Sequence, residues 1–441
     1  MTSRAFCVII LSIKRRRRRR MGGRIIFHVD VNSAFLSWEA ARRVAQGGDD
    51  IRLFPSAIGG DKERRTGIIL AKSIPAKKYG VTTGEPVAMA LRKCPKLELY
   101  SPDFRLYEKC SRAFMDICRE YAPVVEKYSI DECFLDMTGT EALYPDPIAI
   151  AHTIKNRIRD ELGFTVNIGI GGNKLLAKMA SDFEKPDKVH TLFEEEIPSK
   201  LWPLPVRELF SVGRSTAERL NRACVRTIGD LAHLTPEEAQ QILGRKLGQQ
   251  LHDFANGISD APVSDQPEEA KCFSISTTLE NDVTETEQAK KVLLALAYSV
   301  AARLRSDGAR CRCIGVTIRS NDFKDRSHQR SLEQATDITS EIYREASALF
   351  DELWDGRTPL RLLGILLSDL TRDENEQATL FSDDSEQRER ARSLDRAVDA
   401  LRMRFGADTV VLGTNYQSEL KVGRKYRAQI EHGAKGSGGR R

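Results

Sequence analysis

The chain has 441 residues, a length that predicts two to four domains, and its 41% hydrophobic and 30% charged residues are typical of a soluble globular protein. No stretch reaches the roughly 18 consecutive apolar residues that a membrane-spanning helix needs, so we expect no membrane association. Nine cysteines without a Cys-x-x-Cys pair argue against a disulfide scaffold or zinc ribbon and indicate a reducing, cytoplasmic environment.

The formal net charge of +6 is concentrated at the two ends of the chain. Residues 1–20 carry +8 and residues 421–441 carry +6, so the part between them carries −8. A general affinity for nucleic acid therefore does not follow from the net charge. Because Met21 opens a strand-like segment, we expect it to be the true start, with residues 1–20 an over-extended reading frame; the alternative is a basic arm for DNA or membrane phosphates.

Strands and helices alternate in the first half of the chain. The expected elements are a buried strand at 24–31, a helix at 32–46, a strand at 66–72, a short helix at 75–81, an amphipathic helix at 104–121, strands at 123–130 and 133–139, a helix at 147–162, a strand at 165–171 and a helix at 173–183. Antiparallel neighbours around 125–138 predict an α/β or α+β core.

The second half of the chain changes character twice. The expected elements are short helices punctuated by glycine over 193–260, a Pro- and charge-rich linker at 262–272, alternating strands over 273–371 around helices at 286–306 and 339–354, and a last helix at 386–404. Between residues 372 and 385 the chain is polar and acidic, with one apolar island.

Three carboxylates stand where charge is costly. Asp30 ends the first strand, and Asp131 and Glu132 lie at the junction of two strand-like runs. Such carboxylates lose hydration unless a positive charge compensates them, and Mg²⁺ prefers oxygen ligands of this kind. Two such ions can activate a hydroxyl and stabilise a leaving phosphate oxygen. The simpler alternative is a helix cap and a hairpin turn; downstream lysines and glycines, suited to a triphosphate, weigh against it.

Four motifs carry a resemblance to a known family. They are HVDVNSAF at 28–35, AKKYGV at 76–81, YSIDECFLD at 128–136, and GIGGNKLLAK at 169–178, which continues to Lys185 and Pro186. In this order and spacing they resemble the Y-family DNA polymerases of the bacterial DinB type, over about residues 24–420.

The resemblance implies an α+β multidomain right hand. Its expected parts are an extension at 1–20, a palm at 21–33 and 99–192, fingers at 34–98, a helix-hairpin-helix thumb at 193–261, a linker at 262–272, a little finger at 273–371, a flexible clamp-binding segment at 372–385, and a helix with a basic tail at 386–441. The implied activity is template-directed, error-prone translesion synthesis from dNTPs, without a proofreading exonuclease.

The resemblance also implies roles for residues at the active site. Asp30, Asp131, Glu132 and the main-chain carbonyl of Val31 match the ligands of two Mg²⁺ ions, with Glu132 as the catalytic carboxylate. Phe35, five residues after Asp30, matches the steric gate that excludes a 2′-hydroxyl; a core phenylalanine is the alternative.

Two lysines match the positions that hold the triphosphate, Lys77 and Lys185, although a solvated surface charge is the alternative for each. This sequence departs from the family pattern nearby. Ile74 replaces a frequent aromatic residue with a hydroxyl group, and Lys77 replaces a frequent arginine. The ammonium of Lys77 is a point charge, whereas the guanidinium of an arginine can bind through two hydrogen bonds. Asn32 and Ala34 replace a common acid and a common aromatic, at positions that are not metal ligands in the family.

Two segments are expected to contact DNA. The turn Val212-Gly213-Arg214 resembles a helix-hairpin-helix, whose amides can face a phosphate, although such a glycine can also be only a helix cap. Residues 301–330 carry a net charge of +5, and Arg310, Arg312 and Arg319 are the expected contacts; the alternative is a solvated charged face.

A pentapeptide in the acidic segment resembles the motif by which bacterial polymerases dock on the sliding clamp (the beta subunit). It spans residues 377–381, with Gln377, Leu380 and Phe381 as its anchors and Ala378 in place of a frequent leucine.

We expect the protein to be a monomer. Two alternatives remain: a catalytically idle DNA- and clamp-binding protein, which the three carboxylates disfavour, and a nucleotidyl cyclase, which leaves the thumb-like and clamp-like segments unexplained.

Overall fold

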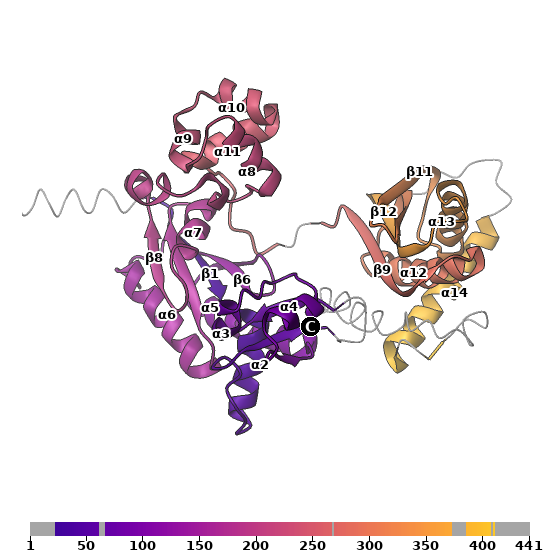
Figure 1. Cartoon of the computed structure of the whole chain (residues 1–441), viewed down its shortest axis with the longest axis horizontal. Helices are drawn as coiled ribbons and strands as arrows, with labels where there is room; N and C mark the ends of the chain where they lie inside the picture. The colour runs from indigo at the N-terminus through magenta and orange to yellow at the C-terminus, as the bar shows by residue number, and fades with distance from the viewer. Residues whose placement is uncertain (1–22, 61–66, 267–268, 373–384, 407–408, 411–441) are drawn as a thin grey trace, which may run out of the picture. The chain divides into compact units, whose positions relative to one another are not determined.

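The computed structural model describes residues 23–60, 67–266, 269–372, 385–406 and 409–410. These residues form two compact units, which divide at residues 267–268 (Figure 1). Each unit combines sheets with helices, as expected for an α+β multidomain protein. Within the described residues, no helix has the length and apolar character needed to cross a bilayer.

A five-stranded sheet forms the centre of the first unit. Its order is β5 (Val124–Lys127), β6 (Glu132–Asp136), β1 (Ile26–Val31), β7 (Val166–Gly171) and β8 (Val189–Leu192). Neighbouring strands are antiparallel except β7 and β8, which are parallel. The apolar strand β1 lies in the middle because both of its faces are covered.

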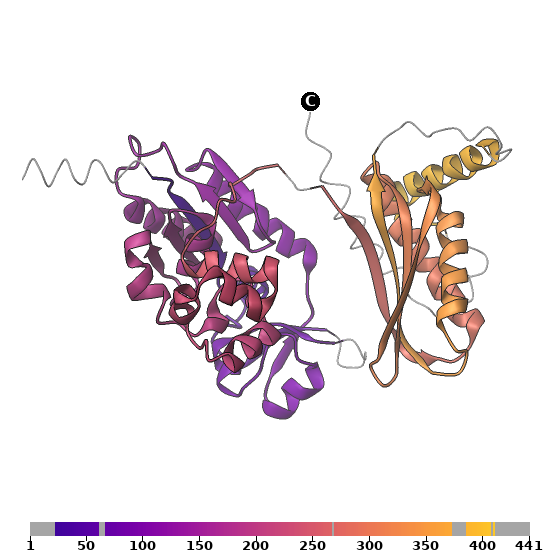
Figure 2. The same cartoon turned by 90° about the horizontal axis from the view of Figure 1, so that it is seen from above.

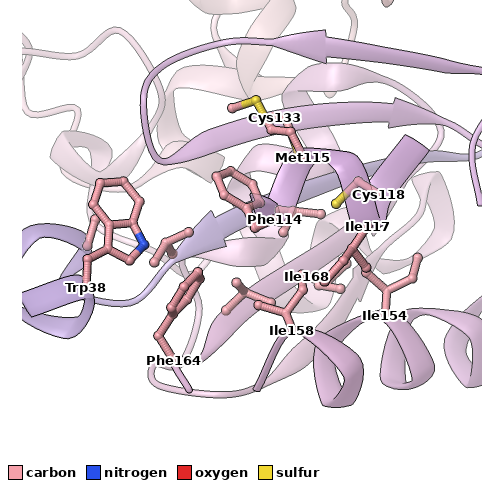
Figure 3. Close-up of a cluster of buried hydrophobic side chains, with 14 of the residues drawn as sticks. Trp38, Phe114, Met115, Ile117, Cys118, Cys133, Ile154, Ile158, Phe164 and Ile168 are labelled. Carbon is pink, nitrogen blue, oxygen red and sulfur yellow. The ribbon is translucent and has the colours of Figure 1, made fainter. Parts of the chain in front are cut away.

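Side chains of β1 alternate between the two faces of this sheet. Phe27, Val29 and Val31 point into a large apolar cluster with α5 (Phe104–Arg119) and α6 (Pro147–Leu162). Figure 3 shows part of this cluster, in which Phe114 and Ile117 of α5 lie close to Ile154 and Ile158 of α6. The period of two therefore directs His28 and Asp30 to the opposite face.

The opposite face carries α7 (Lys174–Ser181), which packs on β1 and β7. The helix approaches closely because β7 presents glycine here: a Cβ on Gly169 would lie 2.0 Å from the carbonyl oxygen of Ala177. A Cβ on Gly171 would lie 2.8 Å from Leu176 Cβ. The glycines that looked suited to a triphosphate thus serve helix packing.

A smaller sheet has a core of its own. It contains β2 (Ser56–Gly59), β3 (Ile69–Lys72) and β4 (Glu98–Tyr100), in the order β3-β2-β4. The accompanying helices are α3 (Ile74–Lys78) and α4 (Val87–Lys93). The helix α2 (Ala34–Ala45) packs instead into the large cluster, through Leu36 and Trp38.

Short helices follow the large sheet. They are η1 (Glu194–Glu196), η2 (Ile197–Leu201), η3 (Val206–Glu208), α8 (Arg214–Arg222), α9 (Ile228–His233), α10 (Pro236–Leu243) and α11 (Arg245–Ala255). Thr227 and Thr235 start two of them with capping boxes. Their apolar faces share a cluster with Leu175 and Leu176 of α7, so this helical region is built directly on the large sheet.

The second unit is a four-stranded antiparallel sheet covered by helices. Its order is β11 (Asp325–Thr336), β10 (Arg310–Ser320), β12 (Leu360–Thr371) and β9 (Cys272–Val283). The helices α12 (Thr286–Ser306) and α13 (Thr339–Leu353) lie on one face of the sheet (Figure 2).

The last described helix, α14 (Ser385–Phe405), docks through buried charge. Arg392 pairs with Asp337 at 2.9 Å, and Arg305 of α12 pairs with Asp395 at 3.2 Å. Asp395 also accepts a hydrogen bond from the backbone N–H of Thr339, at the start of α13. The helix therefore turns charged residues inward.

The structure contains the helices expected from the sequence, but it adds short elements. The strands β2, β4 and β8 and the helix α4 have three to seven residues each, too few for a clear period. The sequence did not predict β11, because this edge strand is exposed along most of its length and has no apolar alternation. The expected linker begins with packed residues, because Val263 is buried against Phe134.

Candidate active site

The sheet brings the three predicted carboxylates to one place. Asp30 at the end of β1 is the register partner of Glu132 at the start of β6, so their side chains lie on the same face. Asp131 is next to Glu132, and its carbonyl oxygen accepts a hydrogen bond from the N–H of Val31 at 3.0 Å. About a hundred residues of sequence separate β1 from β6, so only strand pairing unites these acids.

The simpler explanations of these acids are only partly correct. The N-cap residue of α2 is Ser33, so Asp30 does not cap this helix. Asp131 does lie in the connection between β5 and β6, where Ser129 Oγ donates a 2.6 Å hydrogen bond to its carboxylate. The turn therefore orients Asp131 without using all of its lone pairs.

Two lysines from the α7 side oppose the carboxylates. Lys185 pairs with Asp30 and, at 2.8 Å, with Asp182. Lys178 on α7 donates to Glu132 Oε1 at 3.0 Å. Two of the carboxylates are thus each paired with a lysine ammonium, while Asp131 adds a further negative charge.

Burial and charge act differently on the two acids of the register pair. Burial raises the pKa of Asp30 to about 6, against the charge of Lys185, and the nearby charges of Glu132 and Asp131 add to the rise. Burial also acts to raise the pKa of Glu132, but the surrounding charges, foremost the ammonium of Lys178, outweigh it and lower this pKa to about 2. An added cation would therefore favour the ionised form of Asp30 most.

His28 lies beneath the carboxylates, fully buried on the same face of β1. Its Nδ1 is 2.8 Å from Ser181 Oγ, whereas its Nε2 is 3.8 Å from Glu132 Oε2, too far for a hydrogen bond. Burial lowers the pKa of His28, so a neutral ring is expected at neutral pH. Lys178 is therefore the main partner of Glu132.

The donor set fits a hard divalent cation in its chemistry. Three carboxylates and the adjacent backbone of Val31 gather at one strand end, and oxygen is the ligand that Mg²⁺ prefers. Within the described residues, however, no group of three His, Cys, Asp or Glu side chains is already arranged as a metal site. Cation binding would require Lys185 to leave Asp30.

Phe35 lies on the first turn of α2 in an aromatic cluster. Its ring stacks on Tyr107 at a centroid distance of 4.7 Å and meets the edges of Trp38 and Phe104 at 5.9 and 6.3 Å. Unlike Trp38 and Tyr107, which are fully buried, Phe35 is only partly buried. The ring is thus held in place while keeping some exposed surface.

Lys77 lies elsewhere in the first unit, exposed on the short helix α3. Lys72 on β3 is close enough that the charge of Lys77, after burial, helps to lower the pKa of Lys72. Lys72 also donates to Thr83 Oγ1 at 3.1 Å. Two cations therefore gather here, of which sequence reasoning singled out only Lys77.

The expected DNA contacts differ in their availability. Gly213 is the N-cap of α8, whose first turn has no side-chain cap, and the side chain of Arg214 is 95% exposed beside Glu218. In the second unit Arg312 is exposed and Arg310 is partly buried. Arg319 makes a bidentate pair with Asp325 at 2.5 and 2.8 Å. The predicted clamp residues Gln377, Leu380 and Phe381 lie outside the described residues.

Family models cover most of the chain. The impB/mucB/samB family matches residues 29–182, and the C-terminal domain of that family matches residues 270–380. A model described as the thumb domain of DNA polymerase-iota matches residues 207–259. The matched segments thus include the carboxylates, α8 and the four-stranded sheet.

Curated relatives extend the match over nearly the whole chain. A DNA polymerase IV from Clostridium acetobutylicum is 44% identical over 402 residues, which are 90% of this chain and 100% of that protein. The chain belongs to the Y family of DNA polymerases, in its bacterial DinB type. DNA polymerase IV 1 of Bacillus subtilis is 36% identical over 401 residues, 90% of this chain and 94% of that protein.

A solved structure agrees in fold. A Y-family DNA polymerase chimera superposes with a TM-score of 0.68 at 24% identity, covering 79% of this chain and 100% of that chain. The prediction of a DNA-directed DNA polymerase with an α+β multidomain fold is confirmed. Its substrates are primer-template DNA and nucleotides, and its work is translesion synthesis in DNA repair.

Sequence reasoning about this polymerase missed several residues around the carboxylates. Lys178 stands in a quoted motif, one helical turn after Lys174, which pairs with Glu126 at 2.6 Å. That spacing of four residues would have placed both lysines on one face of a helix. His28 and Asn167 carried no comparable signal, because their partners are far away in the sequence.

Proposed function

We propose that this polymerase transfers nucleotides by a two-metal mechanism, with Asp30, Asp131, Glu132 and the Val31 carbonyl holding two Mg²⁺ ions. The observation that supports it is the convergence of three carboxylates at one end of β1 and β6, with only two ammonium groups opposing them. When bound, the ions activate the primer 3′-hydroxyl and stabilise the leaving pyrophosphate.

The protein residues hold the reactants in this mechanism. Glu132 is ionised at neutral pH, as its pKa of about 2 requires, and it acts as the catalytic carboxylate. Lys185, released from Asp30, and Lys77 neutralise the triphosphate, and the ring of Phe35 fills the space that a 2′-hydroxyl would need. Positioning and charge neutralisation supply most of the rate in such transfers.

Substitution of Asp131 tests the metal proposal. Asp131→Ala is expected to abolish primer extension and to weaken Mg²⁺ binding, measured by titration of the DNA-bound protein. Asp136→Ala is the matched control, because Asp136 lies at the other end of β6 and accepts a hydrogen bond from the nearby N–H of Thr138. Full extension by Asp131→Ala would refute the mechanism, whereas absence of extension by the parent protein would favour a DNA-binding protein without catalysis.

We also propose that the parts of the chain follow the family's right hand. The large sheet serves as the palm, the three-stranded region as the fingers, the helices of 193–261 as the thumb and the second unit as the little finger. The exposed N-terminus of α8 at Val212, Gly213 and Arg214, together with Arg310, Arg312 and Arg319, would hold DNA phosphates. Binding should then weaken steeply as salt increases.

We propose that residues 377–381 dock on the sliding clamp, and this proposal rests on their sequence alone. Deletion of this segment should reduce clamp-dependent processivity while leaving single-nucleotide incorporation unchanged. Equal processivity with and without the segment would remove the proposal. We further propose that the polymerase is a cytoplasmic monomer without an exonuclease. Cell fractionation tests the location, and sedimentation tests the monomeric state. Release of a mismatched primer terminus by the purified protein would contradict the absence of an exonuclease.

A further inference from the structure

The loop that carries Lys185 lies over two buried amides. It joins Asp182, at the end of α7, to Val189, at the start of β8. Beneath it, Asn167 on β7 is 0% exposed and Asn32, just after β1, is 8% exposed. Asn32 Nδ2 donates a 3.1 Å hydrogen bond to Asn167 Oδ1, so the two amides form one unit.

The amide pair binds the loop backbone on both sides of Lys185. Asn167 Nδ2 donates to the carbonyl oxygens of Ser181 at 3.0 Å and Glu184 at 2.7 Å. Asn167 Oδ1 accepts from the N–H of Lys188 at 3.3 Å, and Asn32 Oδ1 accepts from the N–H of Asp187 at 3.0 Å.

Only an amide can make this set of bonds. The side chain of Asn167 gives both of its donors to carbonyl oxygens, while its oxygen accepts from two N–H groups. A carboxylate would lack the donors, and an apolar residue would remove all four bonds, including those to the buried Asn32 amide and the Ser181 carbonyl, which is costly. The loop has no repeating backbone ladder of its own, so these bonds, together with the 2.8 Å ion pair of Lys155 and Asp187, hold its path.

We propose that Asn32 and Asn167 are positioning residues for nucleotide binding: they fix the 182–188 loop so that the Lys185 ammonium stays at the carboxylates, where the triphosphate must arrive. This inference rests on the proposed role of Lys185. Neither amide touches the nucleotide. Their loss lets Lys185 sample positions away from the site, which weakens binding in the ground state and in the transition state alike.

Pre-steady-state incorporation with the Mg²⁺- and DNA-bound polymerase tests the proposal. Asn167→Ala is expected to raise the dissociation constant for dNTP about tenfold, the loss of roughly one hydrogen bond to a charged group, while the maximal rate changes little. Asn256→Ala is the matched control. Asn256 is a partly buried amide that, like Asn167, donates to two carbonyl oxygens, those of Ala232 and His252, but it belongs to the short helices. Its dNTP affinity should equal that of the parent.

A double-mutant cycle shows whether the amide acts through Lys185. In a Lys185→Ala background, Asn167→Ala should no longer change the dNTP affinity. An equal loss in both backgrounds would overturn the positioning role. An effect of Lys185→Ala together with no effect of Asn167→Ala would also overturn it, while leaving the proposed function intact. Normal dNTP affinity in Lys185→Ala would remove the triphosphate role itself and this inference with it.

A second variant protects the test against misfolding. Asn32→Ala removes the bond to Asp187 but leaves both donations of Asn167 in place. We expect about a threefold loss of dNTP affinity, again only when Lys185 is present. A drop in the maximal rate without a change in dNTP affinity would contradict the proposal for both amides, because loop positioning should act on binding.

Discussion

Buried carboxylates occur in both units, but different groups oppose them. In the second unit Arg392 pairs with Asp337, and Asp395 accepts from both Arg305 and the N–H of Thr339. In the first unit Asp30 and Glu132 each meet one lysine, and Asp131 adds a negative charge beside them. Arginines and a backbone N–H thus oppose the second cluster, where Arg305 also pairs with Asp399 at 2.7 Å, whereas lysines oppose the first.

The difference shows what marks a functional site. Desolvation is costly for any charge, and the buried charges under α14 offset that cost with hydrogen-bonded ion pairs within the protein. The carboxylates at the end of β1 do so only in part, and the raised pKa of Asp30 reports the remaining strain. The desolvation of Asp30 that Lys185 does not offset, rather than burial itself, distinguishes the first cluster.

The largest effect is expected at Asp30. Asp30→Asn should reduce nucleotide incorporation by about 10³-fold or more, because a neutral amide is a poor ligand for Mg²⁺. The folded pKa of about 6 lies above the ordinary value of 3.8, so ionisation of Asp30 disfavours folding as pH rises through this window. At pH 8 the metal-free variant should therefore unfold at the same temperature as the parent or higher. A clear decrease would contradict the contrast between the clusters.

At Asp395 we expect the opposite of Asp30: a loss of stability without a loss of activity. Asp395→Asn should lower the stability of the second unit by about 2 kcal/mol, because it weakens a buried, hydrogen-bonded ion pair that holds α14, although Arg305 keeps Asp399. Single-nucleotide incorporation below the unfolding transition should stay unchanged. The control is Asp351→Asn in the exposed pair with Lys290, which should cost at most about 0.5 kcal/mol. Calorimetry compares the stability losses of the two variants. Equal losses would mean that the buried pair contributes no more to stability than the exposed pair.

An intermediate effect is expected at Phe35. Phe35→Ala should lower the preference for dNTP over the matching ribonucleotide by roughly 10²-fold, because the substitution opens space beside the sugar. Phe104→Ala removes another ring of the same aromatic cluster and should keep the preference. The ratio of kcat/KM for the two nucleotides measures it. Unchanged discrimination in Phe35→Ala would return this ring to a packing role.

The smallest effect separates two arginines of the second unit. Arg312 is exposed, whereas Asp325 holds Arg319 in a bidentate pair. Arg312→Ala should reduce the salt slope of DNA binding by about 1, and Arg319→Ala should change it less, because its charge is already neutralised. Titrations at several salt concentrations measure the slopes. A larger change for Arg319→Ala would mean that DNA displaces Asp325.

The sequence by itself determined the local structure and the chemical content of the site. The alternation in IFHVDV directs Asp30 and His28 away from Phe27 and Val29, and the ordered motifs led to the polymerase family. Helices with clear apolar periods, such as α5 and α12, were predicted close to their observed bounds. These features depend on neighbours within a few residues, which a sequence displays directly.

Only the tertiary structure decided which of these groups meet. Strand pairing across about a hundred residues sets Asp30 opposite Glu132, and the packing of α7 brings Lys178 to them. The bond between Asn32 and Asn167 spans 135 residues, and nothing in the sequence links these two amides. Register and helix packing arise from the whole core, because burial and backbone hydrogen bonding are satisfied jointly by distant segments.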